Sequence, residues 1–177
     1  IDQESFNSIV EAILNAKRIY ILGVRSSAAL ASFLGFYFNL IFDNVRLVHT
    51  TSVSEMFEQI LRASAGDVVI GISFPRYSKR TTKAMQFVKS QGSTVIAITD
   101  SRESPIASFA DYSIIARSDM ASFVDSLVAP LSVINALIVA IGMRKKESVY
   151  NTFERLEAIW DEYQVYEKYD NIDPYRK

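Results

Sequence analysis

The stretch Asp67-Val-Val-Ile-Gly-Ile-Ser73 decides the fold of this chain. It is an almost unbroken apolar run, and a run of this length indicates a strand that is buried on both faces of a sheet. The loop sequence Phe74-Pro-Arg-Tyr-Ser78 follows, and a helical pattern then continues to Gln91, where Gly92 supplies a stop signal. The sequence therefore predicts a strand, a loop and a helix in succession.

The same succession recurs on both sides of this stretch. Strands alternate with helical patterns and are continuously apolar, which is typical of a parallel sheet covered by helices on both faces. We therefore predict an α/β fold that forms one domain over residues 1–177. The predicted strands are 18–22, 45–49, 67–73, 94–99 and 112–116, and the predicted helices are 2–17, 26–42, one after Ser52, 78–91, 106–109, one within 124–143, and 146–168.

The composition excludes several classes of function. The formal net charge is −1 and no basic block stands out, so we expect no nucleic-acid-binding surface within this segment. The chain has no cysteine, which excludes disulfides and cysteine-based zinc sites and fits a reducing, cytoplasmic compartment. Its single histidine, His49, excludes a histidine-rich metal site. We expect neither a metal nor a cofactor.

Two apolar helices raise the question of what covers them. The stretch 124–143 is long enough to span a bilayer. It contains polar residues and lies within the alternating α/β pattern, however, so a buried core or interface helix is favoured and no membrane span is expected. The helix 26–42 is apolar almost all round and must be covered on more than one side. A second subunit is one candidate for that cover.

Two hydroxyl-rich loops form the candidate binding site. In an open parallel sheet, ligands bind at the carboxyl ends of the strands, where the strand order reverses. If the strand order is 2-1-3-4-5, the loops Gly23–Ser27 and Ser73–Thr81 are neighbours at that point. Each loop opens a helix, and a helix N-terminus offers free N–H groups and a partial positive charge that suit a phosphate.

The serines of these loops have two interpretations. Ser26 or Ser27 is expected to cap the first helix and Ser78 the second, and capping alone would explain serines at these positions. A hydroxyl there can also bind a phosphate oxygen or a sugar hydroxyl, and two such loops at the reversal point favour binding. Elsewhere in the chain, Ser52 and Glu55 are expected to form a capping box.

Charged and aromatic side chains extend the predicted site. Lysine and arginine side chains in the loops can neutralise a dianion. Tyr77 can either pack over its loop or touch the ligand, and Ser118 can close the site from the side after the fifth strand. The predicted ligand-binding residues are Arg25, Ser26, Ser27, Ser73, Arg76, Tyr77, Ser78, Thr81 and Ser118.

Five segments of the chain carry a family resemblance. They are Ala16-Lys-Arg-Ile-Tyr-Ile-Leu-Gly-Val-Arg-Ser-Ser27, Ile72-Ser-Phe-Pro-Arg-Tyr-Ser78, Ile98-Thr-Asp-Ser101, Ser104-Pro-Ile-Ala107 and Ala110-Asp111. With these segments the chain resembles a sugar isomerase (SIS) domain, and more narrowly the effector domain of RpiR-type bacterial transcriptional regulators. The resemblance implies a three-layer αβα sandwich with a five-stranded parallel sheet in the flavodoxin-like order 2-1-3-4-5. It also implies a homodimer or homotetramer.

The resemblance further implies a phosphosugar ligand that is held by serine and threonine side chains. Ser26 and Ser27 match the serines of the family's first loop. Ser73 matches the serine that opens the second loop, and Ser78 matches its phosphate-contacting hydroxyl.

Two positions depart from the family pattern. Arg25 stands where the first loop commonly has a second glycine, and its side chain would shrink the site or add a phosphate contact. Pro75-Arg76 stands where the SIS enzymes usually have Ser-Gly, so the backbone around the phosphate should differ from theirs.

Catalysis and sensing place different demands on this site. An aldose–ketose isomerase needs a positioned general base, and SIS enzymes of that type typically use glutamate and histidine. The second loop is followed by Lys79 and Arg80 with no carboxylate nearby, and His49 has no obvious partner. We therefore predict a non-enzymatic, phosphosugar-binding effector and oligomerisation domain, with a stand-alone phosphosugar isomerase or lyase as the alternative. The N-terminal helix-turn-helix domain through which such a regulator binds DNA is expected to be absent from this segment, which begins at Ile1.

Overall fold

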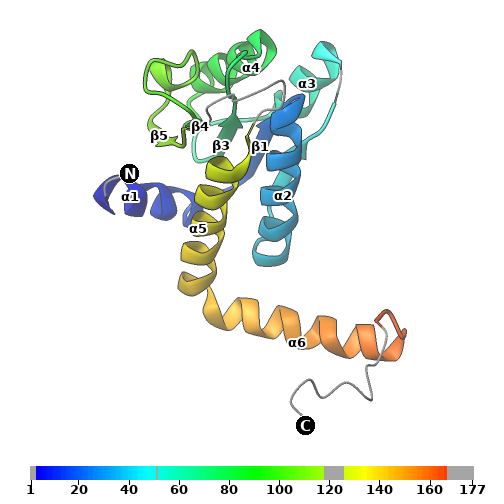
Figure 1. Ribbon diagram of the computed structural model, residues 1–177. Coiled ribbons are helices and arrows are strands. Elements are labelled where there is room, and N and C mark those ends of the chain that lie inside the picture. The colour runs from blue at the N-terminus through cyan, green and yellow to red at the C-terminus, as the bar shows by residue number, and fades with distance from the viewer. Residues whose placement is uncertain (1–2, 51, 118–125, 167–177) are drawn as a thin grey trace.

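A five-stranded parallel sheet forms the centre of the molecule, in the order β2-β1-β3-β4-β5 (Figure 1). The computed structural model describes residues 3–50, 52–117 and 126–166. The strands are β1 (Ile19–Gly23), β2 (Val45–Val48), β3 (Val68–Ile72), β4 (Thr94–Thr99) and β5 (Tyr112–Ile115). The predicted α/β class, strand number and strand order are confirmed.

Helices follow the strands in the predicted alternation. They are α1 (Gln3–Leu14), α2 (Ser26–Ile41), α3 (Val53–Ile60), α4 (Lys79–Ser90), the short 3₁₀ helix η1 (Ala107–Phe109), α5 (Val128–Arg144) and α6 (Lys146–Glu162). Ser118 lies outside the described residues, as does the start of the predicted apolar helix at Val124. Pro130 occupies the first turn of α5, where its missing N–H would have no helical partner anyway.

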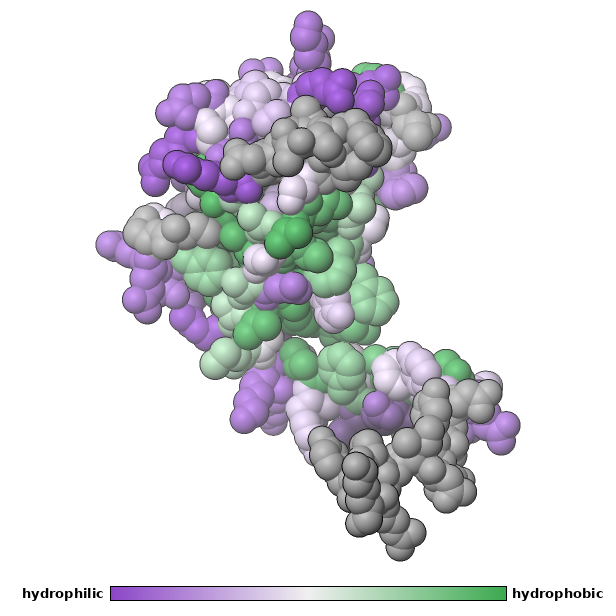
Figure 2. Space-filling model, viewed as in Figure 1, coloured by the Kyte–Doolittle hydropathy of each residue, from purple (hydrophilic) through white to green (hydrophobic). Residues whose placement is uncertain are grey.

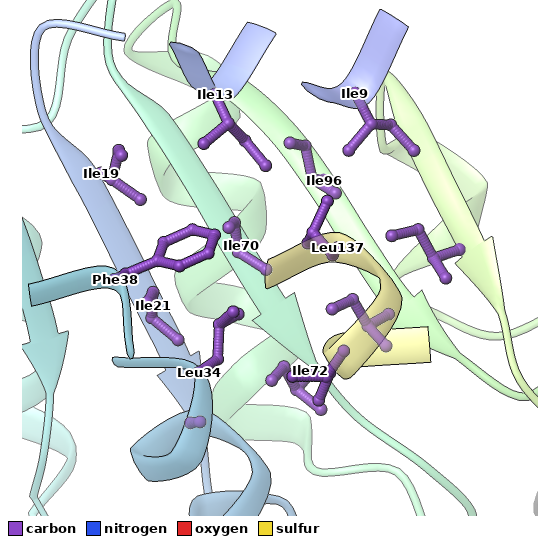
Figure 3. Close-up of a cluster of buried hydrophobic side chains, with 14 of the residues drawn as sticks. Ile9, Ile13, Ile19, Ile21, Leu34, Phe38, Ile70, Ile72, Ile96 and Leu137 are labelled. Carbon is purple, nitrogen blue, oxygen red and sulfur yellow. The ribbon is translucent and has the colours of Figure 1, made fainter. Parts of the chain in front are cut away.

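Helices cover both faces of the sheet, because successive side chains of each strand point to opposite faces. Ile19 and Ile21 of β1 pack in a cluster with side chains of α1, α2 and α5 (Figure 3). Tyr20 and Leu22, the alternate residues of the same strand, pack with side chains of α3 and α4. The molecule is therefore the three-layer αβα sandwich that the family resemblance implied.

Helix α6 differs from the other helices. The chain bends by 97° between α5 and α6, and α6 extends away from the sheet (Figure 1). None of its residues is buried. Within the described residues, no single helix is both long and apolar enough to cross a membrane, and only the bent pair of α5 and α6 passes that test.

One predicted local motif is wrong. Ser52 precedes α3 as expected, but its side chain makes no capping hydrogen bond and instead shares one with Ser54. The Glu55 carboxylate accepts a hydrogen bond from the Thr50 hydroxyl rather than from Ser52. The upstream hydroxyl competes for the carboxylate, and the capping box does not form.

Candidate functional site

The loops that leave β1 and β3 are neighbours at the carboxyl edge of the sheet. Strand β1 pairs with β3 along its whole length, and Gly23 lies opposite Ile72 where the two strands end. The strand order reverses between β1 and β3, since β2 lies on the far side of β1 and β4 on the far side of β3. This reversal point is where open parallel sheets bind ligands.

The first loop is a tight turn that requires glycine at its start. A Cβ at Gly23 would lie 2.5 Å from the backbone oxygen of Ser27, so glycine lets the first turn of α2 approach the end of β1. The N–H of Ser27 donates to the Val24 carbonyl at 3.2 Å and closes a four-residue turn. Arg25 is its first central residue, with φ 57° and ψ −128°, which is the type II′ position that glycine usually occupies.

The predicted cap of α2 is wrong. Arg25 is the N-cap residue, and no side chain makes a capping hydrogen bond. Ser26 and Ser27 already have helical positions, so their hydroxyl groups lie past the place from which a cap accepts a hydrogen bond. Ser26 is exposed and Ser27 is buried. These hydroxyl groups are consequently free of the structural role that capping would have given them.

The second loop begins with a buried serine and ends with a helix cap. The N–H of Ser73 donates to the Ile98 carbonyl at 3.1 Å, which ties the start of the loop to β4. Ser78 caps α4 as predicted, since its hydroxyl accepts from the Thr81 N–H at 3.4 Å. The Ser78 carbonyl also accepts from the Thr82 N–H at 3.1 Å. Ser78 is half-buried, so it fixes the start of α4 while one side remains accessible.

Tyr77 packs over its loop and binds a neighbouring loop. Its hydroxyl donates to the two carboxylate oxygens of Asp100 at 2.9 and 3.1 Å. Burial, the hydrogen bond to Asp100 and the negative charges of Asp100 and Glu103 raise the pKa of Tyr77 to about 12. Asp100 was not predicted as a partner, although its place after β4, next to β3, is the signal that could have found it.

The two loops enclose a pocket of about 450 Å³, a size within the range of small-molecule sites. It brings together all the predicted site residues that the structure describes, and adds Lys79 and Arg80, whose charge the sequence had indicated. Ser118, the remaining predicted residue, lies outside the described residues. The lining residues are Val24, Arg25, Ser26, Ser27, Ile72, Ser73, Phe74, Pro75, Arg76, Tyr77, Ser78, Lys79, Arg80 and Thr81.

Buried hydroxyl groups of the pocket lack hydrogen-bond partners. The side chain of Thr81 is fully buried, and its Oγ1 has no partner among the described residues. Ser27 and Ser73 are buried residues whose hydroxyl groups form no hydrogen bond within the described residues, but unlike Thr81 Oγ1 these oxygens keep some contact with solvent. Because buried polar groups in native proteins are nearly always paired, the Thr81 hydroxyl calls for a partner of another kind, and the Ser27 and Ser73 hydroxyls of the same pocket are available to that partner.

Positive charge lines the exposed part of the same pocket. Arg25, Arg76, Lys79 and Arg80 are all exposed. Arg25, Arg76 and Lys79 form no ion pair within the described parts of the chain. Helices α2 and α4 both begin at the pocket, and their N-termini add partial positive charge. The arrangement can hold an anion that also offers hydrogen-bonding groups.

The pocket's described lining contains no aspartate, glutamate or histidine. His49 lies after β2, where its N–H donates to the Gln59 side chain at 3.2 Å. No group of three or more histidine, aspartate or glutamate side chains within the described residues could hold a metal ion. A wider, more open hollow of about 710 Å³ beside α1 is lined by Glu4 and Glu11 and by no described cation, so it does not suit a phosphate.

Strand order, loop placement and a pocket lined by cations and hydroxyl groups at the reversal point together define a flavodoxin-like α/β domain. The family model of the SIS domain matches residues 12–140, and the chain belongs to this family. The resemblance that the loop sequences indicated is thus confirmed.

Curated relatives of the chain are bacterial regulators. An uncharacterized HTH-type transcriptional regulator of Caldanaerobacter subterraneus is 27% identical over 163 residues, which cover 90% of this chain and 57% of that protein. A second uncharacterized HTH-type transcriptional regulator, from Haemophilus influenzae, is 29% identical over 119 residues, which cover 63% of this chain and 38% of that protein. The chain therefore spans about half the length of these relatives or less.

Solved structures show the same fold. The sugar isomerase domain of an RpiR transcription factor from Sphaerobacter thermophilus superimposes with a TM-score of 0.82 at 26% identity, covering 89% of this chain and 87% of that one. The Vibrio vulnificus NanR protein in complex with ManNAc-6P gives a TM-score of 0.77 at 21% identity, covering 90% of this chain and 62% of that one.

Proposed function

We propose that this chain is the phosphosugar-binding effector domain of an RpiR-type transcriptional regulator. The observation that carries the proposal is a pocket lined by cations that also contains the buried, unpartnered hydroxyl of Thr81 and the hydroxyl groups of Ser27 and Ser73, which form no hydrogen bond within the described residues. A phosphate supplies acceptor oxygens and negative charge, and a sugar supplies hydroxyl groups. One ligand thus satisfies both kinds of group. The NanR structure, which holds ManNAc-6P, supports the assignment by analogy of fold.

The proposed domain senses its ligand and does not transform it. Moving a proton between sugar carbons needs a general base within hydrogen-bond reach of the substrate. The described lining of the pocket offers hydroxyl, guanidinium and ammonium groups instead. Relatives of the chain are regulators, and the DNA-binding step is assigned to a helix-turn-helix domain outside this segment. A regulator of this kind acts in the bacterial cytoplasm.

The proposed domain also assembles with a second copy of itself. Helices α2 and α5 carry apolar residues on several sides, and Figure 2 shows apolar surface gathered over this part of the molecule. Exposed apolar residues there include Phe36, Val139 and Met143. Helix α6 projects beside this surface with Tyr150 and Phe153 exposed. A contiguous apolar surface of this kind marks a protein–protein contact.

The assembly is tested by one pair of variants and a mass measurement by light scattering. Val139→Glu places a charge on the α5 surface and is expected to convert a dimer or tetramer to a monomer. Leu61→Glu, at an equally exposed position after α3, is expected to leave the mass unchanged. A monomeric wild-type protein, or an assembly that tolerates Val139→Glu, contradicts this part of the proposal.

Calorimetric titration with a panel of sugar phosphates tests the ligand. Fructose 6-phosphate, ribulose 5-phosphate, N-acetylmuramic acid 6-phosphate and inorganic phosphate form the panel, and each sugar phosphate is also incubated with the protein and assayed for product. Binding of at least one sugar phosphate without turnover is expected, with inorganic phosphate as a weak competitor. Turnover of any member establishes the isomerase or lyase alternative, and absence of binding by the whole panel overturns the effector proposal.

A further inference from the structure

We propose that the ligand carries a second anionic group besides its phosphate, and that Arg25 binds this second group. The ligand would then be a phosphorylated sugar acid or a sugar bisphosphate. This inference rests on the proposed phosphosugar-binding function and narrows the class of sugar. Three features of the pocket support it: its excess of positive charge, the backbone conformation of Arg25, and the division of the lining between the two loops.

The pocket holds more positive charge than one phosphate can balance. A phosphate monoester carries at most about two negative charges near pH 7. Arg25, Arg76 and Lys79 supply three positive charges that no described carboxylate pairs with, even when Arg80 is set aside. The nearby carboxylate of Asp100 accepts from Tyr77 and does not line the pocket. One cation is left over after the phosphate binds, and the N-termini of α2 and α4 add to the excess.

Arg25 is the residue whose presence is hardest to explain by folding. Its φ of 57° and ψ of −128° form a conformation that glycine adopts freely and that a residue with a Cβ adopts only under strain. Its side chain is exposed and makes no hydrogen bond or ion pair within the described residues. Backbone strain that no contact within the fold offsets is typical of functional sites. The guanidinium group is the part of Arg25 that a glycine would not supply.

The two loops divide the binding of the two anionic groups. The loop after β3 carries the buried Ser73 and Thr81 and the cap of α4 at Ser78, a combination that suits a desolvated phosphate. Arg25 lies on the other loop, at an exposed position of the same pocket. A planar guanidinium group binds a carboxylate or phosphate through two parallel hydrogen bonds. The sugar would therefore connect a phosphate at the α4 N-terminus with a second anion at Arg25.

Matched pairs of ligands test the second anionic group. The wild-type chain is titrated calorimetrically with glucose 6-phosphate and 6-phosphogluconate, with fructose 6-phosphate and fructose 1,6-bisphosphate, and with inorganic phosphate. At least one doubly anionic sugar is expected to bind about tenfold or more tightly than its partner, which corresponds to one charge-assisted contact. The acid and the bisphosphate distinguish the two sources of the second group.

Three substitutions assign the preference to Arg25. Arg25→Ala is expected to remove the preference by weakening the doubly anionic sugar about tenfold more than its singly phosphorylated partner, and Arg25→Lys is expected to retain part of the preference. Lys83→Ala, an exposed cation of α4 outside the pocket, is the control and is expected to change neither affinity. Arg25→Ala keeps the strained backbone, so a loss of binding by this variant reports the charge alone.

Thermal unfolding without ligand tests the strain separately. Arg25→Gly and Arg25→Ala both remove the charge, but only glycine relaxes the turn, so Arg25→Gly is expected to have a Tm about 2–8 °C above that of Arg25→Ala. Equal melting temperatures overturn the strain argument. Equal affinities within both ligand pairs overturn the second anionic group and leave the proposed function standing. If neither the sugars nor inorganic phosphate bind, both proposals fail.

Discussion

The amino and carboxyl ends of the sheet differ in how their buried polar side chains are hydrogen-bonded. At the amino end, Asp67 before β3 is fully buried and binds Arg18 before β1 through two hydrogen bonds, Arg18 Nε to Oδ1 at 3.0 Å and Arg18 Nη2 to Oδ2 at 2.7 Å. The Ser64 N–H donates to the same carboxylate at 2.8 Å. At the carboxyl end, the buried hydroxyl of Thr81 has no partner within the described residues, and the hydroxyl groups of Ser27 and Ser73 form no hydrogen bond there.

This difference separates groups that hold the fold together from groups available to a ligand. A buried polar group that is paired within the chain stabilises the folded state or at least does not weaken it, whereas an unpaired one costs about 1–3 kcal/mol. Two buried hydroxyl groups have no partner within the described residues: that of Thr81 lines the pocket and is open to a ligand, whereas that of Tyr20 in β1 lies outside it. Substitution of a paired group at either end should change stability without changing ligand affinity, and substitution of an unpaired hydroxyl in the pocket should do the reverse.

The largest expected effect on stability is that of Asp67→Asn. The amide leaves the Arg18 guanidinium without its counter-charge, and because the Arg18 side chain is 31% exposed and partly screened by solvent, the expected loss is about 2 kcal/mol of unfolding free energy. Ligand affinity should stay within twofold, because the length of β3 places Asp67 about 15 Å from the pocket. Urea unfolding and calorimetric titration measure the two quantities.

The Asp67 carboxylate also makes the unfolding free energy depend on pH, in a direction set by its pKa. Burial would raise the pKa of Asp67, but the hydrogen bonds from Arg18 and the Ser64 N–H outweigh it and hold the pKa below its usual value. The carboxylate thus stabilises the fold above about pH 4, and this contribution is lost as the pH falls through the folded-state pKa. In Asp67→Asn this loss of unfolding free energy at acid pH should be absent.

Glu11→Gln is the control for an exposed ion pair. It breaks the half-exposed pair with Arg144 and should lower the unfolding free energy by less than about 1 kcal/mol.

An intermediate effect on stability is expected of Tyr77→Phe. This variant tests whether a hydroxyl that lines the pocket contributes to ligand binding even when it is already hydrogen-bonded within the chain. Tyr77 lines the pocket but its hydroxyl is already bound to Asp100. The substitution should cost about 1–2 kcal/mol of stability and leave ligand affinity within twofold. A large loss of affinity with unchanged stability contradicts the rule that paired groups are structural.

Alkaline unfolding refines this prediction. The pKa of Tyr77 is raised to about 12 in the folded state, so the folded protein holds this proton more tightly than the unfolded chain does. Its contribution to stability is complete below about pH 10 and is lost as the pH rises through about 12. The difference between wild type and Tyr77→Phe should shrink over that range. The Tyr150 hydroxyl donates to Glu154 on the exposed surface, so Tyr150→Phe should leave the stability nearly unchanged.

The sequence predicted the strands, their order and the placement of the loops better than the local hydrogen bonds of side chains. Apolar runs identified each strand because burial on both faces demands continuous hydrophobicity, and strand order followed from the family resemblance. The same logic placed the loops after β1 and β3 together, which brought the described site residues into one pocket.

Side-chain pairing was harder to predict, because several donors and acceptors compete within a few residues. Ser78 caps its helix as predicted, whereas Ser26 and Ser27 do not, because the turn at Arg25 closes through backbone atoms alone. Glu55 binds Thr50 instead of Ser52 for a similar reason. Arginine at position 25 does not predict a positive φ. The indication was the glycine that the family commonly has at this position, because glycine adopts a positive φ freely.

A small or favourable effect on stability is expected of Thr81→Val, which separates unpaired from paired hydroxyl groups most directly. Valine has the same shape as threonine and removes a buried hydroxyl that has no partner in the described chain. The unfolding free energy should therefore stay the same or rise by about 1 kcal/mol, while the affinity for a sugar phosphate should fall about tenfold. Thr82→Val is the matched control, because the Thr82 hydroxyl already donates to the Ser78 carbonyl at 3.2 Å. That variant should lose stability and keep its affinity. If Thr81→Val instead destabilises the unliganded protein and leaves binding intact, the Thr81 hydroxyl belongs to the fold and the contrast between the two ends of the sheet fails at this residue.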